Sequence, residues 1–255
     1  MPAPTVSVTF DNLGEASELE RGTWPEGQPL GEHHSVRESL PQLLRMLAAE
    51  DIRATFFVEG LNGELYPDAL AGLAAEGHEV ACHGWRHEEW AGLDSDRERE
   101  LLARAHAPLG APVGFRPPGG EMTASSAELL SELGFTYCSP AGEATERLGG
   151  LAVLPFRWPL IDAYYYLPQF AGLRRAHGDP EEPMAPAALR DAVLGAIDDH
   201  VRGAGHLVLL FHPFLLSEGP ETVAEVLSRV GALESAGDLR CLRMDEAAAA
   251  LPASP

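Results

Sequence analysis

The chain has 255 residues, of which 45% are hydrophobic, and a formal net charge of −21. This apolar content is ordinary for a globular protein with a core, whereas the acidic balance argues against nucleic acids and anionic membrane surfaces, which need a basic footprint. All eighteen basic residues are arginine, which excludes Schiff-base, pyridoxal and phosphate-loop chemistry because each needs a lysine.

Short β-branched runs alternate with segments of helical periodicity along the chain. Strands are predicted at residues 5–10, 53–60, 78–82, 113–117, 151–156, 206–214 and 239–244. Helices are predicted at residues 35–50, 66–77, 93–106, 123–134, 185–205, 219–235 and 245–251. The proline-bounded stretch PLIDAYYYLPQF, residues 159–170, is predicted to be a loop.

Capping signals support several of these boundaries. Ser35 and Glu38 have the spacing of a capping box, and Asp94 or Ser95 is the expected N-cap of the helix that follows. Gly134 is expected to end its helix, and the final residues 250–255, ALPASP, are expected to fray.

The three cysteines, Cys82, Cys138 and Cys241, lie far apart and form no C-x-x-C pair. We expect reduced, mostly buried thiols rather than disulfides or zinc ligands. The N-terminal sequence MPAPTVSVTF lacks the basic and apolar regions of a signal peptide, and no apolar run approaches eighteen residues. These features predict a soluble, cytoplasmic protein.

Seven or eight βα units without repeats or a linker predict a single domain over residues 1–255. Its parallel sheet is expected to be either closed into a barrel or doubly wound. In both architectures ligands bind beyond the carboxyl ends of the strands. Polar residues follow several predicted strands at that end, which predicts a single active site. They are Asp11, Asn12, Glu59, His83, His87, Arg116 and His212.

The stretch VACHGWRHEEW, residues 80–90, places His83 and His87 four positions apart, with Trp85 between them. Two interpretations are open: a metal-binding pair, or two surface histidines on a turn. His33 and His34, in GEHHSV, are interpreted as a polar loop rather than as ligands. The tyrosines at 164–166 are expected either to pack in the core or to form a substrate wall.

The motifs TFDN, HGWRH, RPPGG and LLFHP, in this order, resemble those of the polysaccharide deacetylase superfamily (NodB homology, carbohydrate esterase family 4). The resemblance extends from about residue 6 to residue 213. It implies a distorted (β/α) barrel that hydrolyses an acetamido group at a divalent-metal site, with Zn²⁺ as the expected metal.

The resemblance also implies roles for individual residues. Asp11 matches the general base, Arg116 the arginine that holds it, and His212 the general acid, which Asp162 would tune. Leu210 matches a leucine that lines the acetyl pocket. The remaining residues expected near the substrate are Trp85, Pro118, Gly119 and Glu59, and the expected metal ligands are Asn12, His83 and His87.

Asn12 departs from the family pattern, which has an aspartate as the third metal ligand. An amide oxygen carries no charge, so zinc affinity should fall. Three alternatives follow: Asn12 binds the metal weakly, Glu59 replaces it, or the site works without a metal.

The motif HGWRHEEW, the compact length and the aromatic WPLIDAYYY segment look more like the cytoplasmic allantoinase-like and cyclic-imidase-like branch than like the secreted chitin or peptidoglycan deacetylases. We expect a metal-dependent deacetylase in carbohydrate metabolism that acts on a small N-acetylated sugar or related metabolite, with a homo-oligomer as a possible assembly. One alternative is a cyclic imide or ureide hydrolase that works without a metal. The other is a barrel that has lost catalysis and binds a ligand.

Overall fold

A computed structural model describes residues 3–252 and contains one nine-stranded sheet. Eight strands follow the path β6-β7-β5-β4-β3-β2-β1-β8, and β9 also pairs with β1. All pairs are parallel except β6 with β7. The strands are β1 (Thr5–Asp11), β2 (Thr55–Val58), β3 (Glu79–Cys82), β4 (Gly114–Phe115), β5 (Tyr137–Cys138), β6 (Glu146–Leu148), β7 (Leu151–Val153), β8 (His206–Phe211) and β9 (Arg240–Cys241).

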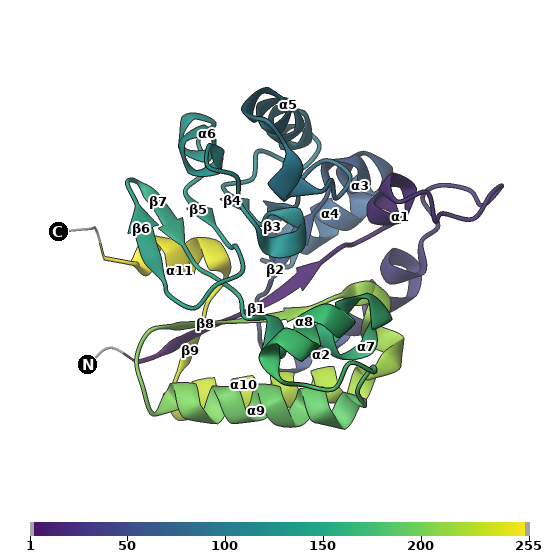
Figure 1. Cartoon of the computed structure of the whole chain (residues 1–255). Coiled ribbons are helices and arrows are strands. Elements are labelled where there is room, and N and C mark those ends of the chain that lie inside the picture. The colour runs from purple at the N-terminus through teal and green to yellow at the C-terminus, as the bar shows by residue number, and fades with distance from the viewer. Residues whose placement is uncertain (1–2, 253–255) are drawn as a thin grey trace.

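The sheet curls into a half-barrel of the type expected for a distorted (β/α) barrel (Figure 1). Its path does not close in the described residues, since β6 and β8 stand at its two ends. A single bridge between Ile161 and Leu210 connects the segment after β7 to β8. Strands β1, β2 and β8 are buried along almost their whole length, because helices cover the sheet and leave these strands no solvated face.

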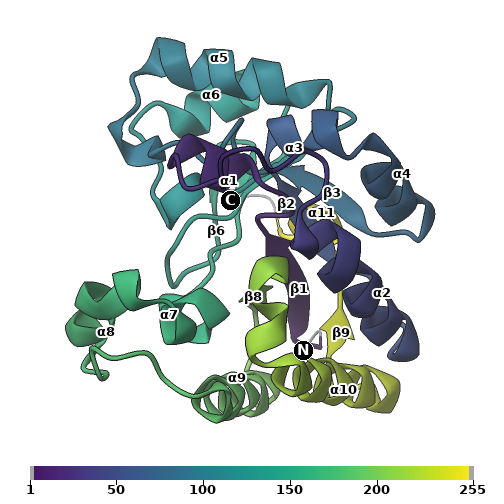
Figure 2. The same cartoon turned by 90° about the vertical axis from the view of Figure 1, so that its right-hand side faces the viewer.

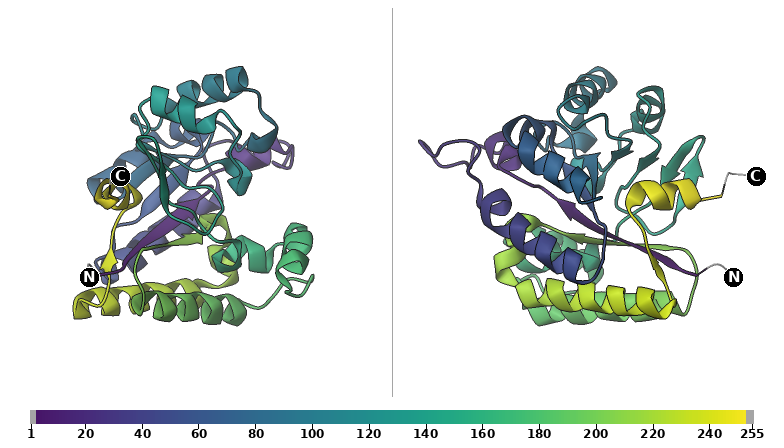
Figure 3. Two further views of the ribbon diagram at one scale, coloured as in Figure 1. Left: turned by 60° about the vertical axis from the view of Figure 1, so that its left-hand side comes forward. Right: turned by 180° about the vertical axis from the view of Figure 1, so that it is seen from behind.

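Helices surround the sheet (Figures 1 and 2). Helices α9 and α10 lie side by side along one face, whereas α5 and α6 lie on the opposite side of the molecule (Figure 3). The helices are α1 (Ala16–Glu20), α2 (Leu40–Ala49), α3 (Gly60–Leu65), α4 (Pro67–Ala75), α5 (Ser95–His106), α6 (Ser126–Glu132), α7 (Asp162–Tyr166), α8 (Ala171–His177), α9 (Pro186–Val201), α10 (Pro220–Ala236) and α11 (Met244–Ala250).

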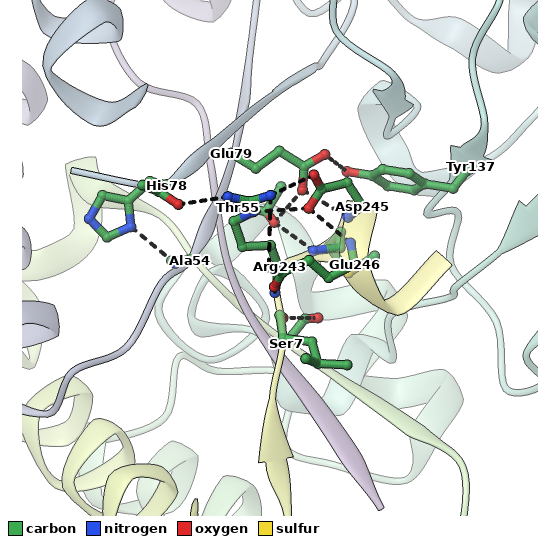
Figure 4. A network of polar contacts seen from close by, with 12 residues as sticks. Ser7, Ala54, Thr55, His78, Glu79, Tyr137, Arg243, Asp245 and Glu246 are labelled. Carbon is green, nitrogen blue, oxygen red and sulfur yellow. Dashed lines mark hydrogen bonds and ion pairs between the residues drawn. The ribbon is translucent and has the colours of Figure 1, made fainter. Parts of the chain in front are cut away.

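A buried polar network joins α11 to the amino ends of the central strands (Figure 4). The Glu79 carboxylate accepts hydrogen bonds from the hydroxyls of Thr55 (2.7 Å) and Tyr137 (2.9 Å) and from the backbone N–H of Asp245 (3.1 Å). Burial raises the pKa of Glu79 to about 7. The network therefore fixes α11 at the end of the barrel opposite to the predicted site.

Two local predictions are wrong. The capping box at Ser35 and Glu38 does not form: residues Ser35–Ser39 make a π-helical turn, and the Ser35 hydroxyl instead accepts the backbone N–H of Gly14 at 2.9 Å. The predicted loop at 159–170 is largely helical, since it contains α7 and two short 3₁₀ turns. Prolines at the start of both turns are compatible with helix because that position needs no N–H donor.

Other predictions hold with shifted boundaries. Asp94 caps α5 by accepting the N–H of Arg97 at 2.9 Å. The cysteines are unpaired, with Cys82 and Cys138 buried. The sequence patterns missed α1, α3, α8 and the short strands β5 and β6. Of the tail expected to fray, residues 253–255 lie outside the described part. No helix within residues 3–252 combines the length and apolarity needed to cross a bilayer.

Candidate active site

A cavity of about 350 Å³ opens at the carboxyl ends of the strands. Its reacting end is lined by polar side chains that come from four strand ends and the loops that follow them. They are Asp11, Asn12, His83, His87, Arg116 and His212. Residues separated by as many as 201 positions in sequence, Asp11 and His212, thus meet at a single cavity, which has the size of small-molecule sites.

Asp11, the last residue of β1, is held by Arg116 after β4. The Arg116 guanidinium donates to Asp11 Oδ1 at 2.6 Å, to the Thr9 hydroxyl at 2.9 Å and to the Ser139 hydroxyl at 2.9 Å. The guanidinium carbon Cζ of Arg116 lies 3.9 Å from the centre of the Phe57 ring. Burial lowers the pKa of this arginine, which the Asp11 carboxylate counteracts. Since both members of the ion pair are buried, loss of either would leave an uncompensated charge.

His212, directly after β8, is oriented by Asp162 at the start of α7. Its Nδ1 lies 2.6 Å from Asp162 Oδ1, and its backbone N–H donates to Asp162 Oδ2 at 2.7 Å. Burial alone would lower the pKa of His212, but the Asp162 carboxylate outweighs burial and raises that pKa above its ordinary value. The imidazolium form is therefore favoured at the cavity, with Nδ1 facing the carboxylate.

His83 follows β3, and its Nδ1 lies 2.8 Å from the carbonyl oxygen of Arg116. A carbonyl only accepts, so Nδ1 carries the proton and Nε2 presents a lone pair. Burial lowers the pKa of His83 to about 3, which keeps the ring neutral. His83 Nε2 lies 3.9 Å from Asp11 Oδ2, so the ring is placed beside the carboxylate.

His87 is brought to the same cavity by a tight turn. The Glu88 carboxylate accepts the backbone N–H groups of Trp85 and Arg86, both at 3.0 Å, and His87 itself adopts a left-handed φ of 71°. The two histidine rings lie 5.0 Å apart, edge to face. Burial, together with His83, lowers the pKa of His87 well below its ordinary value.

The donors partly fit a divalent cation. Asn12 Oδ1 is buried on the cavity and has no hydrogen-bond partner in the described part of the chain, while His83 Nε2 has a free lone pair. No group of three His, Cys, Asp or Glu residues within 3–252 is close enough to hold a metal. The fit thus depends on two neutral imidazoles and an uncharged amide, a set that binds zinc more weakly than one with a carboxylate.

Arg21, which the sequence patterns did not single out, also lines this cavity. Its Nη2 lies 3.4 Å from His87 Nδ1. Because a guanidinium only donates, Nδ1 accepts in this contact and the proton of neutral His87 lies on Nε2. A cation bound through Nε2 of His87 would require that contact to change. Nothing in the sequence around Arg21, an exposed position in a Glu-rich segment, indicates this placement.

The other residues expected near the substrate divide into two groups. Leu210 and Gly119 line the cavity. Trp85 is buried beneath the turn, with the Arg104 guanidinium 3.9 Å from its ring centre, and does not line the cavity. Glu59 is buried and accepts the Asn62 side-chain N–H at 2.9 Å, and it does not line the cavity either. Pro118 faces a neighbouring surface hollow with Gly119.

His33 and His34 do not line the cavity. His33 is buried and pairs with the Ser35 hydroxyl at 2.7 Å, whereas His34 is exposed. The tyrosines at 164–166 do not line the cavity either: the Tyr164 hydroxyl donates to Asp179 and that of Tyr165 to the carbonyl of Pro159. The aromatic-rich segment reaches the cavity through Phe156, Trp158 and Phe170 instead.

Comparison with known proteins shows the family of the chain and its fold. The sequence model of the polysaccharide deacetylase family matches residues 1–138, so the chain belongs to that family. It is 30% identical over 103 residues to a peptidoglycan-N-acetylglucosamine deacetylase from Bacillus cereus, an alignment that covers 38% of each protein.

Two solved structures have the same fold over nearly the whole chain. One is a protein assigned to the polysaccharide deacetylases from Mycobacterium smegmatis, with a TM-score of 0.81, 28% identity, and coverage of 97% of this chain and 90% of that one. The other is PuuE allantoinase, with a TM-score of 0.76, 18% identity, and coverage of 98% and 92%. At 18% identity the second shows the fold alone.

Proposed function

We propose that this protein, as a single catalytic domain, hydrolyses an amide C–N bond by removing an acyl group from nitrogen. The observation that supports this best is the pair of oriented groups on one cavity: Asp11, held by Arg116, and His212, held by Asp162. Amide hydrolysis needs both a base to activate water and an acid to protonate the leaving nitrogen.

In this proposal the Asp11 carboxylate accepts a proton from the attacking water. Arg116 holds that carboxylate in place, because the guanidinium occupies Oδ1 and leaves Oδ2 toward His83. His212, protonated and oriented by Asp162, then donates its proton to the departing nitrogen. Acid and base are thus held ready before substrate binds.

We further propose that Asn12, His83 and His87 would hold the divalent cation, with Zn²⁺ as the first candidate. Such an ion polarises the scissile carbonyl and lowers the pKa of water when bound. The neutral donors predict a weakly held ion. A small N-acetylated sugar or related metabolite is the substrate class that agrees best with the names of the relatives.

A second candidate is a cyclic imide or ureide hydrolase that uses no metal. The contact of Arg21 with His87, together with the uncharged Asn12, favours it. A barrel that binds ligand without catalysis is the outcome if no amide is turned over.

The test is hydrolysis of a panel that contains N-acetylglucosamine and its oligomers, succinimide, hydantoin and allantoin, with and without EDTA. Asp11→Asn should reduce turnover of any active substrate by at least ~100-fold, since a positioned base contributes about 10²–10⁴-fold. Asp68→Asn, an exposed carboxylate on α4, is the matched control and should retain full activity. Turnover retained by Asp11→Asn would refute the assigned base.

A further inference from the structure

The cavity has two unlike ends. Beyond the reacting groups, it extends along a wall contributed by the segment between β7 and α9, which includes α7 and α8. These helices lie beside α9, on the side of the molecule away from α2 and α4 (Figure 2). The side chains that the segment presents to the cavity are chiefly aromatic and aliphatic.

An aromatic surface forms the centre of this wall. The Phe156 and Trp158 rings lie 5.2 Å apart at 88°, and the Trp158 and Phe170 rings lie 5.5 Å apart at 45°. Leu167 and Leu173 extend the surface. Trp158, Phe170 and Leu167 are only half-buried, so apolar area remains available to a ligand in the cavity.

Few hydrogen-bonding groups lie on this side of the cavity. Among the lining residues of the segment, Gln169 has a polar side chain and Trp158 adds a single indole N–H. The hydroxyls of Tyr164 and Tyr165 are turned away and bonded within the segment. A sugar ring placed here would lose water from its hydroxyls with few partners in return, and each buried hydroxyl left without a partner weakens binding.

The wall is also held rigidly by Arg174 on α8. Its fully buried guanidinium donates to the carbonyl oxygens of Leu167 and Pro180, both at 3.0 Å, and also to those of Tyr164 and Glu181. One side chain thus joins α7, the turn after it and the segment before α9. A wall fixed before binding costs little entropy when a ligand is ordered against it.

We propose that the substrate is a small amide or imide that carries an apolar substituent, and that Trp158, Leu167 and Phe170 form the pocket that selects this substituent. The inference rests on the proposed amide hydrolysis, but it replaces the N-acetylated sugar favoured by the names of the relatives with an apolar-substituted substrate. A phenyl or branched aliphatic group fits the wall because its burial removes apolar area from water without leaving polar groups unpaired.

The test is calorimetric binding to wild-type protein, which needs no turnover. Acetamide and N-methylacetamide are compared with phenylacetamide and N-benzylacetamide, which carry the ring on either side of the amide, and with N-acetylglucosamine. The better-placed phenyl ligand should bind at least ~10-fold more tightly than its parent, since burial of an aromatic side group contributes roughly 1.5–3 kcal/mol.

Trp158→Ala should remove most of that preference. Trp24→Ala is the matched control: Trp24 donates its indole N–H to the carbonyl of Gln28 and does not line this cavity, so its loss should leave the preference unchanged. If Trp158→Ala does not fold, Leu167→Asn, which keeps a side chain of similar size and shape but carries an amide, should weaken the phenyl ligand by several-fold.

Equal binding of the phenyl ligands and their parents, or equally tight binding of N-acetylglucosamine, would overturn the inference even if amides are hydrolysed. A phenyl preference that survives both wall variants would overturn it as well. A phenyl preference lost in these variants, without hydrolysis of any amide, would refute the proposed function and leave the apolar selecting pocket standing.

Discussion

Asp162→Asn should move the pH dependence of catalysis in a defined direction. Asp162 Oδ1 lies 2.6 Å from His212 Nδ1 and also accepts the N–H of Ala163 at 2.7 Å, while Oδ2 accepts the backbone N–H of His212. The substitution keeps the shape but removes the negative charge that raises the pKa of His212. Loss of that charge therefore shifts the equilibrium of His212 toward the neutral imidazole and lowers its pKa.

The general acid must be protonated, so activity should fall as pH rises through the pKa of His212. In Asp162→Asn this alkaline limb should move toward lower pH, because the carboxylate that raises the pKa of His212 is lost. All three contacts of Asp162 are with N–H groups. The side-chain NH2 of the asparagine, which replaces one carboxylate oxygen, would therefore face another N–H donor. That mismatch should cost about 1–3 kcal/mol of stability.

The assay is kcat/KM against pH for wild type, Asp162→Asn and Asp179→Asn, with the substrate identified in the amide panel. Asp179 lies in the same segment and accepts the Tyr164 hydroxyl, so its variant controls for loss of a carboxylate without contact to His212. An unmoved alkaline limb in Asp162→Asn would show that His212 is not the acid, or that Asp162 does not set its pKa.

Two further substitutions test the metal site and the buried acid. Asn12→Asp should raise Zn²⁺ affinity by at least ~10-fold in calorimetry, since a charged oxygen joins two imidazoles; equal affinity would show that Asn12 is not a ligand. Glu59→Gln tests a carboxyl whose pKa burial raises to about 8. Because the folded state holds this proton more tightly than the unfolded state does, wild-type stability loses up to ~1.4 kcal/mol per pH unit between about 4.5 and 8. Glu59→Gln has no group that titrates at this position. Its free energy of unfolding relative to wild type, measured with urea, should therefore increase from pH 5 to pH 8. A difference between the two proteins that does not change with pH would contradict the buried ionisation.

Much of the fold could be predicted because it depends on local pattern. The continuous apolar run of β8 identifies a buried strand, and the spacing of apolar residues in α2, α9 and α10 identifies helices. Both can be recognised from the sequence of each element alone. The segment at 159–170 was mispredicted as a loop because its prolines and aromatics fit either structure. Its helical form depends on Arg174, which lies outside the segment and binds its carbonyls.

The approximate position of the site also followed from the sequence, since parallel strands bring their carboxyl ends to the same edge. Asp11 ends a strand, His83, Arg116 and His212 each follow one, and all four line the cavity. Glu59 follows a strand too, but its side chain points to Asn62 and not into the cavity. Strand position fixes where a residue lies, whereas side-chain direction depends on packing with neighbours distant in sequence.

The sequence by itself therefore determined most of the order of strands and helices, the family and the candidates for the reacting residues, because these depend on local periodicity and short motifs. Only the tertiary structure decided that Arg21 contacts His87, that Asn12 keeps an unpaired oxygen on the cavity, and that Trp158 and Phe170 form its wall. These contacts join segments distant along the chain, and their geometry depends on how the whole barrel packs.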